Sequence, residues 1–431
     1  MKFYSTNNSK HLVTLHEAVI NGLAPDNGLY MPEKIPAFES KFFDSLSEKS
    51  FQEIAYEVAQ AFVKDDISPE QLKKIISHTI TFDAPLIEIE RNVFALELFH
   101  GPTMAFKDFG ARFMSQVLGL FAQQQKREIV ILVATSGDTG SAVANGFWGV
   151  PGTHVVVLYP SGKVSEIQEK QFTTLGNNIT ALEVNGTFDD CQRLVKQAFL
   201  DPELKASFFL TSANSINIAR LIPQSFYYFY AWSRLPENKN VVFSIPSGNF
   251  GNLTAGLIAK KMGLPIQHFV AATNINDIVP QYLTTNNFLP RTSVSTISNA
   301  MDVGNPSNFA RMLDLFHQDH TVMKREIAGY SFTDEDVRVA MRQVFSKFNY
   351  MLDPHGAIGY LGLKKYRTEN SESSGVFLET AHPAKFLEVV ESTLKTRISI
   401  PQELKSFMKR DKTSIPCPAD FISFKKILQD I

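Results

Sequence analysis

Short apolar runs recur through the middle of the chain, and each is followed by a turn and by a segment whose apolar residues have helical spacing. Runs of about four to eight apolar residues bounded by turns are typical of buried strands, and their alternation with helices indicates parallel α/β sheets. A long aromatic-rich segment interrupts this rhythm, so we expect two α/β series. Strands are predicted at 128–134, 154–159, 179–184, 240–245, 268–273 and 376–380, and helices at 142–147, 165–175, 188–199, 214–235 and 253–262.

The two ends of the chain lack this rhythm and are predicted to be mostly helical. In the first 90 residues, one apolar helical pattern ends near Gly22, and further helices are predicted at 51–63 and after Ser68, a capping residue followed by proline. This region carries no obvious reactive group, so we expect a packing or lid element. The tail after Pro383 shows one apolar helical face that includes Phe424.

Composition narrows the class of protein. The chain has 431 residues, of which 44% are hydrophobic and 20% charged, values that exclude a disordered or fibrous protein. The formal net charge of -2 gives no reason to expect a nucleic-acid or membrane-surface partner. Two cysteines cannot form a disulfide framework and fit a reducing compartment. Without a secretion signal or an apolar run long enough to cross a bilayer, we expect a soluble, cytoplasmic protein.

One lysine, Lys107, has aromatic neighbours on both sides. It lies in the stretch ELFHGPTMAFKDFG, after a Gly-Pro turn and between Phe106 and Phe109. An exposed lysine is an ammonium ion with a pKa of about 10.4 and is no nucleophile. Against apolar walls the charged form is disfavoured, and the free amine can attack an aldehyde. The alternative is an exposed pair of Lys107 and Asp108 beside core aromatics, and this stretch alone does not decide between them.

A second candidate is the turn PSGNFGNLT at 246–254, which lies between a predicted strand and a predicted helix. Gly248 and Gly251 permit positive-φ turns, so that successive backbone N–H groups can converge on an anion at the helix start. The turn matches neither the Walker pattern nor Gly-x-Gly-x-x-Gly, so ATP and dinucleotides are not indicated. It is either a phosphate cradle or a plain connection.

Two other polar turns also precede helices. The turn at 135–140 offers hydroxyl and N–H groups to an anion, although Asp138 opposes an anion unless it is bonded to a donor. The segment 214–220 opens the long predicted helix with polar groups. Within it, Arg220 is a candidate for bidentate phosphate contact, and a surface arginine is the alternative.

Other reactive arrangements are absent from the sequence. His317 and His320 are three residues apart without a third ligand, so no metal site is predicted. There is no Gly-x-Ser-x-Gly elbow and no cysteine placed as a nucleophile. The turn at 353–357 either borders a site or only separates two elements.

Six stretches, taken together and in order, resemble a known family. They are HGPTMAFKDFG, ATSGDTGSA, TSANSINIAR, PSGNFGNLTAG, NAMDVGNPSN and FLETAHPAKF, and they are similar to the bacterial and fungal threonine synthases. That family belongs to the fold type II (tryptophan synthase β-like) enzymes that use pyridoxal 5'-phosphate. The resemblance implies two parallel-sheet α/β lobes. It divides the chain into a helical region at 1–90, a catalytic region at 91–385 with a smaller lobe at about 125–215 nested in a larger one, and a helical extension at 386–431.

The resemblance also implies roles for individual residues. Lys107 would bond covalently to the cofactor and act as the base for proton transfer. Thr380 would face the pyridine nitrogen with a neutral hydroxyl, which leaves the ring a weaker electron sink. Asp138 stands where many relatives in the wider fold carry asparagine, and its role stays open. The phosphate of the cofactor would be held by Gly248, Asn249, Phe250, Gly251 and Asn252, and the substrate by Ser136, Thr139, Ser215, Asn217 and Arg220.

The implied reaction is the last step of threonine biosynthesis. Lys107 would remove the Cα proton of O-phospho-L-homoserine and help to move the Cβ proton, and phosphate would leave from Cγ beside Arg220. Reprotonation at Cγ and addition of water at Cβ would then give threonine. We expect the smaller lobe to close over the substrate, and a monomer or homodimer. One alternative is a phospholyase or dehydratase that releases a keto acid and ammonia. Another is a non-catalytic protein that binds the cofactor for storage or signalling, which the retention of Ser215 and Arg220 with Lys107 argues against.

Overall fold

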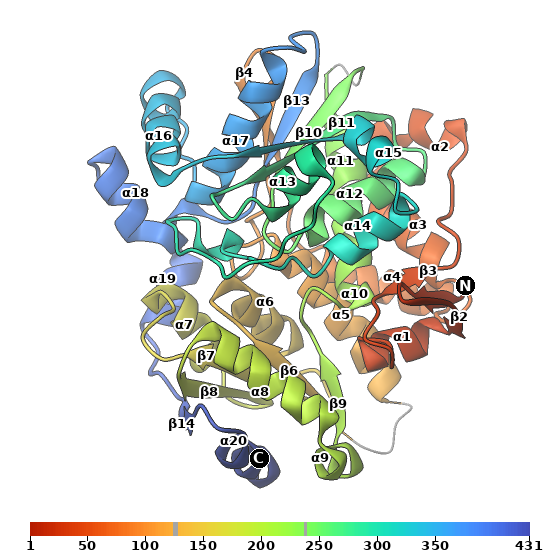
Figure 1. The fold of residues 1–431 in the computed structure, drawn as a ribbon, viewed down its shortest axis with the longest axis vertical. Coiled ribbons are helices and arrows are strands. Elements are labelled where there is room, and N and C mark those ends of the chain that lie inside the picture. Colours follow the sequence, from red (N-terminus) through yellow and green to blue (C-terminus); the bar gives the residue numbers. More distant parts are fainter. Residues whose placement is uncertain (124–127, 237–238) are drawn as a thin grey trace.

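The computed structural model describes residues 1–123, 128–236 and 239–431, which form two α/β lobes and an N-terminal region (Figure 1). A six-stranded sheet in the order β12-β11-β10-β13-β5-β4 lies in the larger lobe, and a five-stranded sheet in the order β14-β8-β7-β6-β9 lies in the smaller one. All pairings in these two sheets are parallel except that of β4 with β5. None of the helices within the described ranges is long and apolar enough to cross a membrane.

The larger lobe confirms the second predicted series of strands. The predicted strands at 240–245, 268–273 and 376–380 correspond to three adjacent strands of its sheet. The strands are β4 (Leu86–Glu90), β5 (Val93–Glu97), β10 (Val241–Pro246), β11 (Ile266–Thr273), β12 (Ile327–Ser331) and β13 (Ser374–Glu379). The helices that accompany them are α5 (Lys107–Ala122), α10 (Ile218–Leu221), η2 (Ile222–Ser225), α11 (Phe226–Arg234), α12 (Gly251–Lys261), α13 (Ile278–Thr285), η3 (Asn299–Met301), α14 (Phe309–Leu315), α15 (His320–Glu326), α16 (Asp334–Phe348), α17 (Pro354–Arg367), η4 (Pro383–Phe386) and α18 (Leu387–Leu394).

The smaller lobe confirms the first series and adds a strand from the far end of the chain. The strand β14 (Ile415–Pro418) pairs with β8, so the tail is not wholly helical as expected. Pro416 and Pro418 disfavour a helix there, and Cys417 packs into the core of this lobe. The remaining strands are β6 (Ile129–Ala134), β7 (Thr153–Pro160), β8 (Ile179–Asn185) and β9 (Phe209–Ser212), and the helices are α6 (Asp138–Phe147), α7 (Glu166–Thr173), α8 (Phe188–Leu200), α9 (Pro202–Ser207), α19 (Gln402–Met408) and α20 (Phe421–Asp430).

The N-terminal region contains the predicted helices and, in addition, a small antiparallel sheet in the order β2-β1-β3. The helix α3 has the predicted bounds and α4 has the predicted start. Ser50 and Ser68 each form a capping box that fixes the helix start. The strands were missed because they are short and β2 is mostly exposed and polar. The elements are β1 (Phe3–Ser5), β2 (Asn8–Val13), α1 (Leu15–Asn21), β3 (Tyr30–Pro32), α2 (Ser40–Asp44), η1 (Leu46–Glu48), α3 (Phe51–Val63) and α4 (Pro69–Thr79).

The long helix predicted at 214–235 is correct only in part, because it begins at Ile218 and is not α-helical throughout. The segment contains the short helix α10, one 3-10 turn and α11. Asn217 caps α10 through a bond from the Ala219 N–H, so the polar residues before it form a turn. Pro223 has no N–H to donate, so the α-helical hydrogen bonding does not continue through it.

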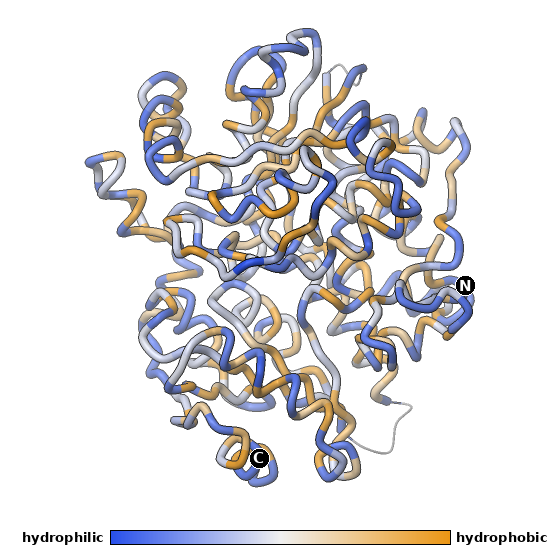
Figure 2. The backbone as a smooth tube through the Cα atoms, in the orientation of Figure 1, coloured by the Kyte–Doolittle hydropathy of each residue, from blue (hydrophilic) through white to orange (hydrophobic). Residues whose placement is uncertain are grey.

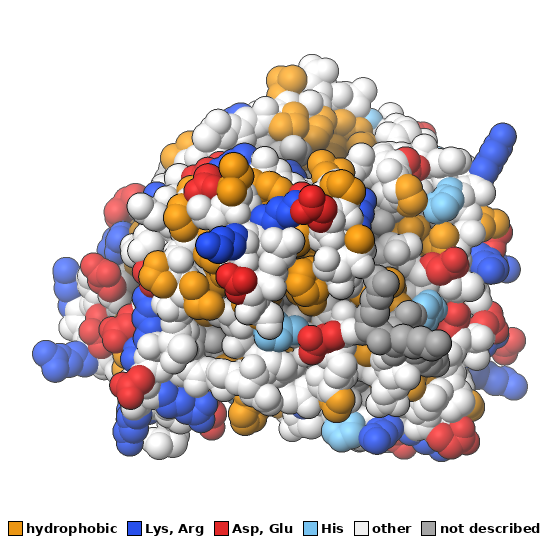
Figure 3. All heavy atoms as spheres, turned by 90° about the horizontal axis from the view of Figure 1, so that it is seen from below, with side chains coloured by type: hydrophobic (Ala, Val, Ile, Leu, Met, Phe, Trp, Pro, Cys, Tyr) orange, Lys and Arg blue, Asp and Glu red, His pale blue; other side chains and the backbone are white. Residues whose placement is uncertain are grey.

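Burial explains why the parallel strands appear in the sequence as unbroken apolar runs. All six residues of β6 and all six of β10 are buried, because helices cover both faces of a parallel sheet. The hydrophobic stretches of the tube lie mainly inside each lobe (Figure 2). On the face shown in Figure 3, acidic and basic side chains are interspersed, as the small net charge suggests.

The helix α20 offers a direct test of the C-terminal packing. Phe424 is fully buried in the core of the smaller lobe, whereas Ile422, on the opposite face of the same helix, is 84% exposed. We expect Phe424→Ala to lower the free energy of unfolding by about 3–5 kcal/mol, and Ile422→Ala to change it by less than about 0.5 kcal/mol. Urea unfolding of both variants measures this, and similar losses in the two would contradict the described docking of the tail.

Candidate active site

The candidate site lies where the larger sheet ends. Strands β10 and β13 are adjacent and parallel, so the turn that follows Pro246 and the residue that follows Glu379 emerge at the same edge. The segment before Lys107 is attached to this edge, because the N–H of Phe106 donates to the carbonyl oxygen of Thr380 at 2.8 Å. The three predicted cofactor segments therefore meet, although they are far apart in the sequence.

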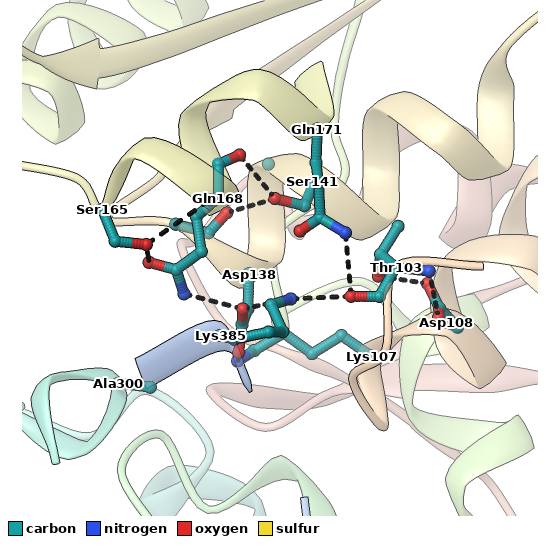
Figure 4. A network of polar contacts seen from close by, with 12 residues as sticks. Thr103, Lys107, Asp108, Asp138, Ser141, Ser165, Gln168, Gln171, Ala300 and Lys385 are labelled. Carbon is teal, nitrogen blue, oxygen red and sulfur yellow. Dashed lines mark hydrogen bonds and ion pairs between the residues drawn. The ribbon is translucent and has the colours of Figure 1, made fainter. Parts of the chain in front are cut away.

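Lys107 is the first residue of α5, and its side chain is 17% exposed. Its Nζ lies 5.1 Å from the centre of the Phe106 ring and 3.6 Å from Oδ2 of Asp138 (Figure 4). Burial lowers the pKa of the Lys107 amine, and the Asp138 carboxylate opposes that shift. Of the two alternatives that the sequence left open, the structure therefore shows the enclosed one. The exposed Lys107–Asp108 pair is excluded, because Asp108 is buried and both of its oxygens accept hydrogen bonds from Thr103.

A second lysine, Lys385, completes the polar cluster and was missed by the sequence analysis. Its fully buried Nζ lies 2.6 Å from Oδ1 of Asp138 and donates to the carbonyl oxygen of Thr103 at 2.8 Å (Figure 4). Gln168 donates to the same Oδ1 at 2.8 Å. Burial opposes ionisation of Asp138, but the two lysines outweigh it and hold the pKa of the carboxyl well below its usual range. The available signal was the lysine in FLETAHPAKF, five residues after Thr380.

The turn at 247–252 has the geometry of an anion site. Phe250 is in the left-handed conformation with φ of 59°, and α12 starts at the next residue. Among the described residues, the backbone N–H groups of 248–252 have no hydrogen-bond acceptor. A Cβ on Gly248 would lie 2.9 Å from the carbonyl oxygen of Ala300, so only glycine fits against that segment. The side chain of Asn252 is bonded to Pro246 and so stabilises the turn itself.

Arg220 is buried, which excludes the surface alternative. Its guanidinium donates through Nη1 to the carbonyl oxygen of Ala213 at 2.5 Å, while Nε has no partner in the described structure. Burial lowers the pKa of Arg220 to about 10, so it stays a cation at neutral pH. The close approach of its backbone to α5 requires Gly110, where a Cβ would lie 2.8 Å from the carbonyl oxygen of Arg220. Its charge contributes to lowering the pKa of Lys107.

The other residues predicted to bind substrate differ in burial and in the hydrogen-bond donors that they have free. Ser136 and Thr139 are half-buried on either side of Asp138, at the start of α6, and Ser215 is half-buried in the turn before α10. The side-chain amide of Asn217 donates to the carbonyl oxygens of Val19 and Ser212, so both of its N–H groups are used. Among the described residues, both side-chain N–H groups of Asn217 are thus bonded to the backbone and stabilise the turn before α10.

The turn at 353–357 borders the site. His355 Nε2 accepts a hydrogen bond from the N–H of Ala300, the residue whose carbonyl oxygen faces Gly248. Its Nδ1 lies 2.6 Å from Oδ1 of Asp353, the residue that caps α17. No group of three or more metal-ligating side chains is found within the described ranges.

Comparisons with known proteins identify the family to which the chain belongs. The chain matches family models described as threonine synthase N terminus over residues 2–80, pyridoxal-phosphate dependent enzyme over 76–380, and threonine synthase C-terminal over 356–428. A threonine synthase from Buchnera aphidicola is 46% identical over 94% of both chains. The chain belongs to the threonine synthase family. It is therefore assigned to the pyridoxal-phosphate-dependent lyases.

Solved structures of the family are similar over the whole chain. The crystal structure of threonine synthase from Escherichia coli has a TM-score of 0.93 and 43% identity, with 100% of both chains covered. A structure of PLP-bound threonine synthase from Brucella melitensis has a TM-score of 0.93 and 33% identity, and covers 100% of this chain and 99% of the other. The site of this chain fits a phosphate-bearing aldehyde, because unpaired N–H donors and an enclosed amine occur at the same sheet edge.

The variant Gly248→Ala tests whether the turn at 247–252 holds the cofactor phosphate. In Gly248→Ala the new methyl group would meet backbone atoms of Ala300 and Met301, so the turn must move and its N–H groups lose their convergence. We expect pyridoxal phosphate to bind at least about tenfold more weakly, a loss of roughly 1.4 kcal/mol. Titration followed by absorbance measures the affinity. Unchanged affinity in a folded variant would show that the turn does not hold the cofactor phosphate.

Proposed function

We propose that the chain converts O-phospho-L-homoserine and water into L-threonine and orthophosphate. The observation that carries the proposal is the enclosed amine of Lys107 at the same sheet edge as the unpaired N–H groups of 248–252. Membership of the threonine synthase family supports it. The proposal includes a cytoplasmic location and a monomer or homodimer, and the two buried free cysteines are consistent with a reducing compartment.

Lys107 is proposed as the residue that moves protons at the substrate. Bound pyridoxal phosphate supplies an aldehyde carbon that bonds to amines, and a ring that delocalises the negative charge left at Cα. As a free amine, Lys107 would accept the Cα proton of the substrate and help to move the Cβ proton. Its low exposure favours the neutral amine, which is the form that can accept a proton.

The substrate phosphate is proposed to bind beside Arg220. A buried guanidinium with an unpaired Nε carries both a positive charge and a free donor, the combination that stabilises a leaving phosphate. Ser136 and Ser215 are half-buried in turns before α6 and α10, and Thr139 is half-buried in the first turn of α6. We assign their hydroxyls to substrate contacts. Asn217 is left out of this set because its amide donors are used.

The cofactor ring is proposed to lie beside Thr380. This residue is 5% exposed and directly follows β13, while its backbone carbonyl fixes the segment that carries Lys107. A hydroxyl has no negative charge to stabilise a protonated pyridine nitrogen, so the ring withdraws electrons more weakly than one paired with a carboxylate. The proton transfers at Cα and Cβ then depend more strongly on correctly placed groups of the chain.

The first experiment separates this function from simple elimination. Purified chain is incubated with pyridoxal phosphate and O-phospho-L-homoserine, and threonine, phosphate and 2-oxobutyrate are measured together. We expect threonine and phosphate in equal amounts. Phosphate accompanied by 2-oxobutyrate and ammonia would identify a phospholyase instead, and no product with firm cofactor binding would favour the storage or signalling alternative.

Lys107→Ala tests the amine. Loss of the base and of the covalent attachment should reduce turnover by at least about 10²–10⁴-fold, because general base catalysis contributes that much by itself. The absorption of the bound cofactor should change as well, since no other amine is assigned to bond with it. Turnover close to that of the unchanged chain would refute the assignment.

Arg220→Met tests the phosphate contact, and Arg193→Met is its matched control. Arg193 is a surface residue paired with Asp190, far from the site in the smaller lobe. Loss of a charge-assisted contact costs roughly 1.5–3 kcal/mol, so we expect KM for O-phospho-L-homoserine to rise at least about tenfold in Arg220→Met. Cofactor affinity should change much less. Equal losses of substrate and cofactor affinity would place Arg220 on the cofactor, and Arg193→Met should leave both unchanged.

A further inference from the structure

Two lysines compete for one carboxylate in the centre of the site. Asp138 faces Lys385 through Oδ1 and Lys107 through Oδ2, and both side chains point toward it (Figure 4). The two separations are unequal. Nζ of Lys385 lies 2.6 Å from its oxygen, whereas Nζ of Lys107 lies 3.6 Å from the other, beyond the range of a hydrogen bond. The carboxylate is thus strongly paired with Lys385 and only weakly with Lys107.

Neighbouring groups hold the strong pair in place. Lys385 also donates to the carbonyl oxygen of Thr103, and Gln171 donates to the same oxygen at 3.0 Å. On the other side, the side-chain amide of Gln168 donates to Asp138, and its side-chain oxygen Oε1 accepts a hydrogen bond from the Ser165 hydroxyl at 2.9 Å. The carboxylate therefore cannot turn toward Lys107 without breaking bonds to both Lys385 and Gln168.

We propose that Lys385 is a positioning residue for the amine of Lys107: it binds the Asp138 carboxylate and so prevents that carboxylate from holding Lys107 as an ammonium ion. Lys385 acts in two ways, since it neutralises the nearest anion and places a second positive charge near Lys107. The inference rests on the proposed role of Lys107 as the reactive amine. It also assigns a role to Asp138, as the anchor of Lys385.

The other charged groups near Lys107 do not replace this pair. Arg220 acts in the same direction as Lys385, because it is a buried cation. Asp108 lies one residue away, but both of its oxygens are bonded to the backbone and hydroxyl groups of Thr103. His382 lies on the segment that leads into η4, and burial lowers its pKa, so it adds no charge at neutral pH. Asp138 is thus the anion that would hold Lys107 as an ammonium ion if Lys385 did not bind it.

The protonation of Lys107 can be measured without turnover. Full-length chain is freed of bound aldehyde with hydroxylamine and then labelled with a small amount of acetic anhydride across a pH series. Because only the neutral amine reacts, the extent of labelling at Lys107, read by peptide mass spectrometry, gives its titration midpoint. Lys385 is completely enclosed, so it does not confuse the measurement.

We expect the midpoint of Lys107 to rise by about one pH unit or more in Lys385→Met, which means roughly tenfold less free amine at a pH below it. Lys385→Gln should raise it as well, and this polar variant keeps a hydrogen-bonding side chain if Lys385→Met fails to fold. Lys385→Arg retains the charge and should leave the midpoint close to that of the unchanged chain. Adding Asp138→Asn to Lys385→Met should bring the raised midpoint down again.

A surface pair provides the control. Lys364 forms an ion pair with Glu90 at 2.6 Å and has a side chain that is 43% exposed, so Lys364→Met should leave the midpoint of Lys107 where it was. An unchanged or lowered midpoint in both Lys385→Met and Lys385→Gln overturns the inference, whatever their activity. A purely structural role for Lys385 would lower the unfolding temperature without moving the midpoint. Failure to form threonine with the expected midpoint shifts would refute the proposed function and leave this inference standing.

Discussion

The carboxylate of Asp138 lies between two lysines, and the balance between them governs what the site can do. A buried carboxylate beside a single lysine would keep that lysine protonated and therefore unreactive. Here Lys385 takes the closer position at 2.6 Å, and Lys107 remains at 3.6 Å. The arrangement costs the protein the burial of several ionisable groups. It is stable because each charge that is removed from water has a partner or a hydrogen bond, as buried charges require.

The topology of the sheet brings these groups together. The carboxyl ends of parallel strands lie at the same edge of a sheet. Because β10 and β13 are adjacent and parallel, Thr380 after β13 lies near the turn after β10. The segment before α5 joins them through the bond from Phe106 to Thr380, and Asp138 arrives from the smaller lobe at the start of α6. The Lys107 amine and the Asp138 carboxylate thus belong to different lobes, so a change in their relative position would also change the strength of their interaction.

Much of this could be predicted from the sequence, for reasons that can be named. Buried strands such as β10 appear as apolar runs, and helices such as α3 carry their start signals in the residues themselves. The interruption of the helix at 214–235 was missed because a turn delays its start and Pro223 lies within a 3-10 turn. The strand β14 was missed because it forms only by pairing with β8, which is distant in the sequence. The position of Lys385 in the site was missed for a similar reason, because contacts with distant parts of the chain determine it. A lysine beside apolar residues has no periodicity to reveal it, and its partners Asp138 and Thr103 lie more than 200 positions away in the chain.

The N-terminal region is connected to the candidate site through one buried arginine of α14, Arg311. Arg311 is completely enclosed and donates to the carbonyl oxygens of Tyr30 in β3 and Ile216 in the turn before α10. It also donates to Oδ1 of Asn308, whose own side-chain amide lies near Gly251 at the start of α12. Since a guanidinium offers five donors in a fixed plane, moving any one of these three segments would leave a buried donor unpaired. The small N-terminal sheet is therefore coupled to the turns before α10 and α12, and a truncation that removed it would disturb both turns.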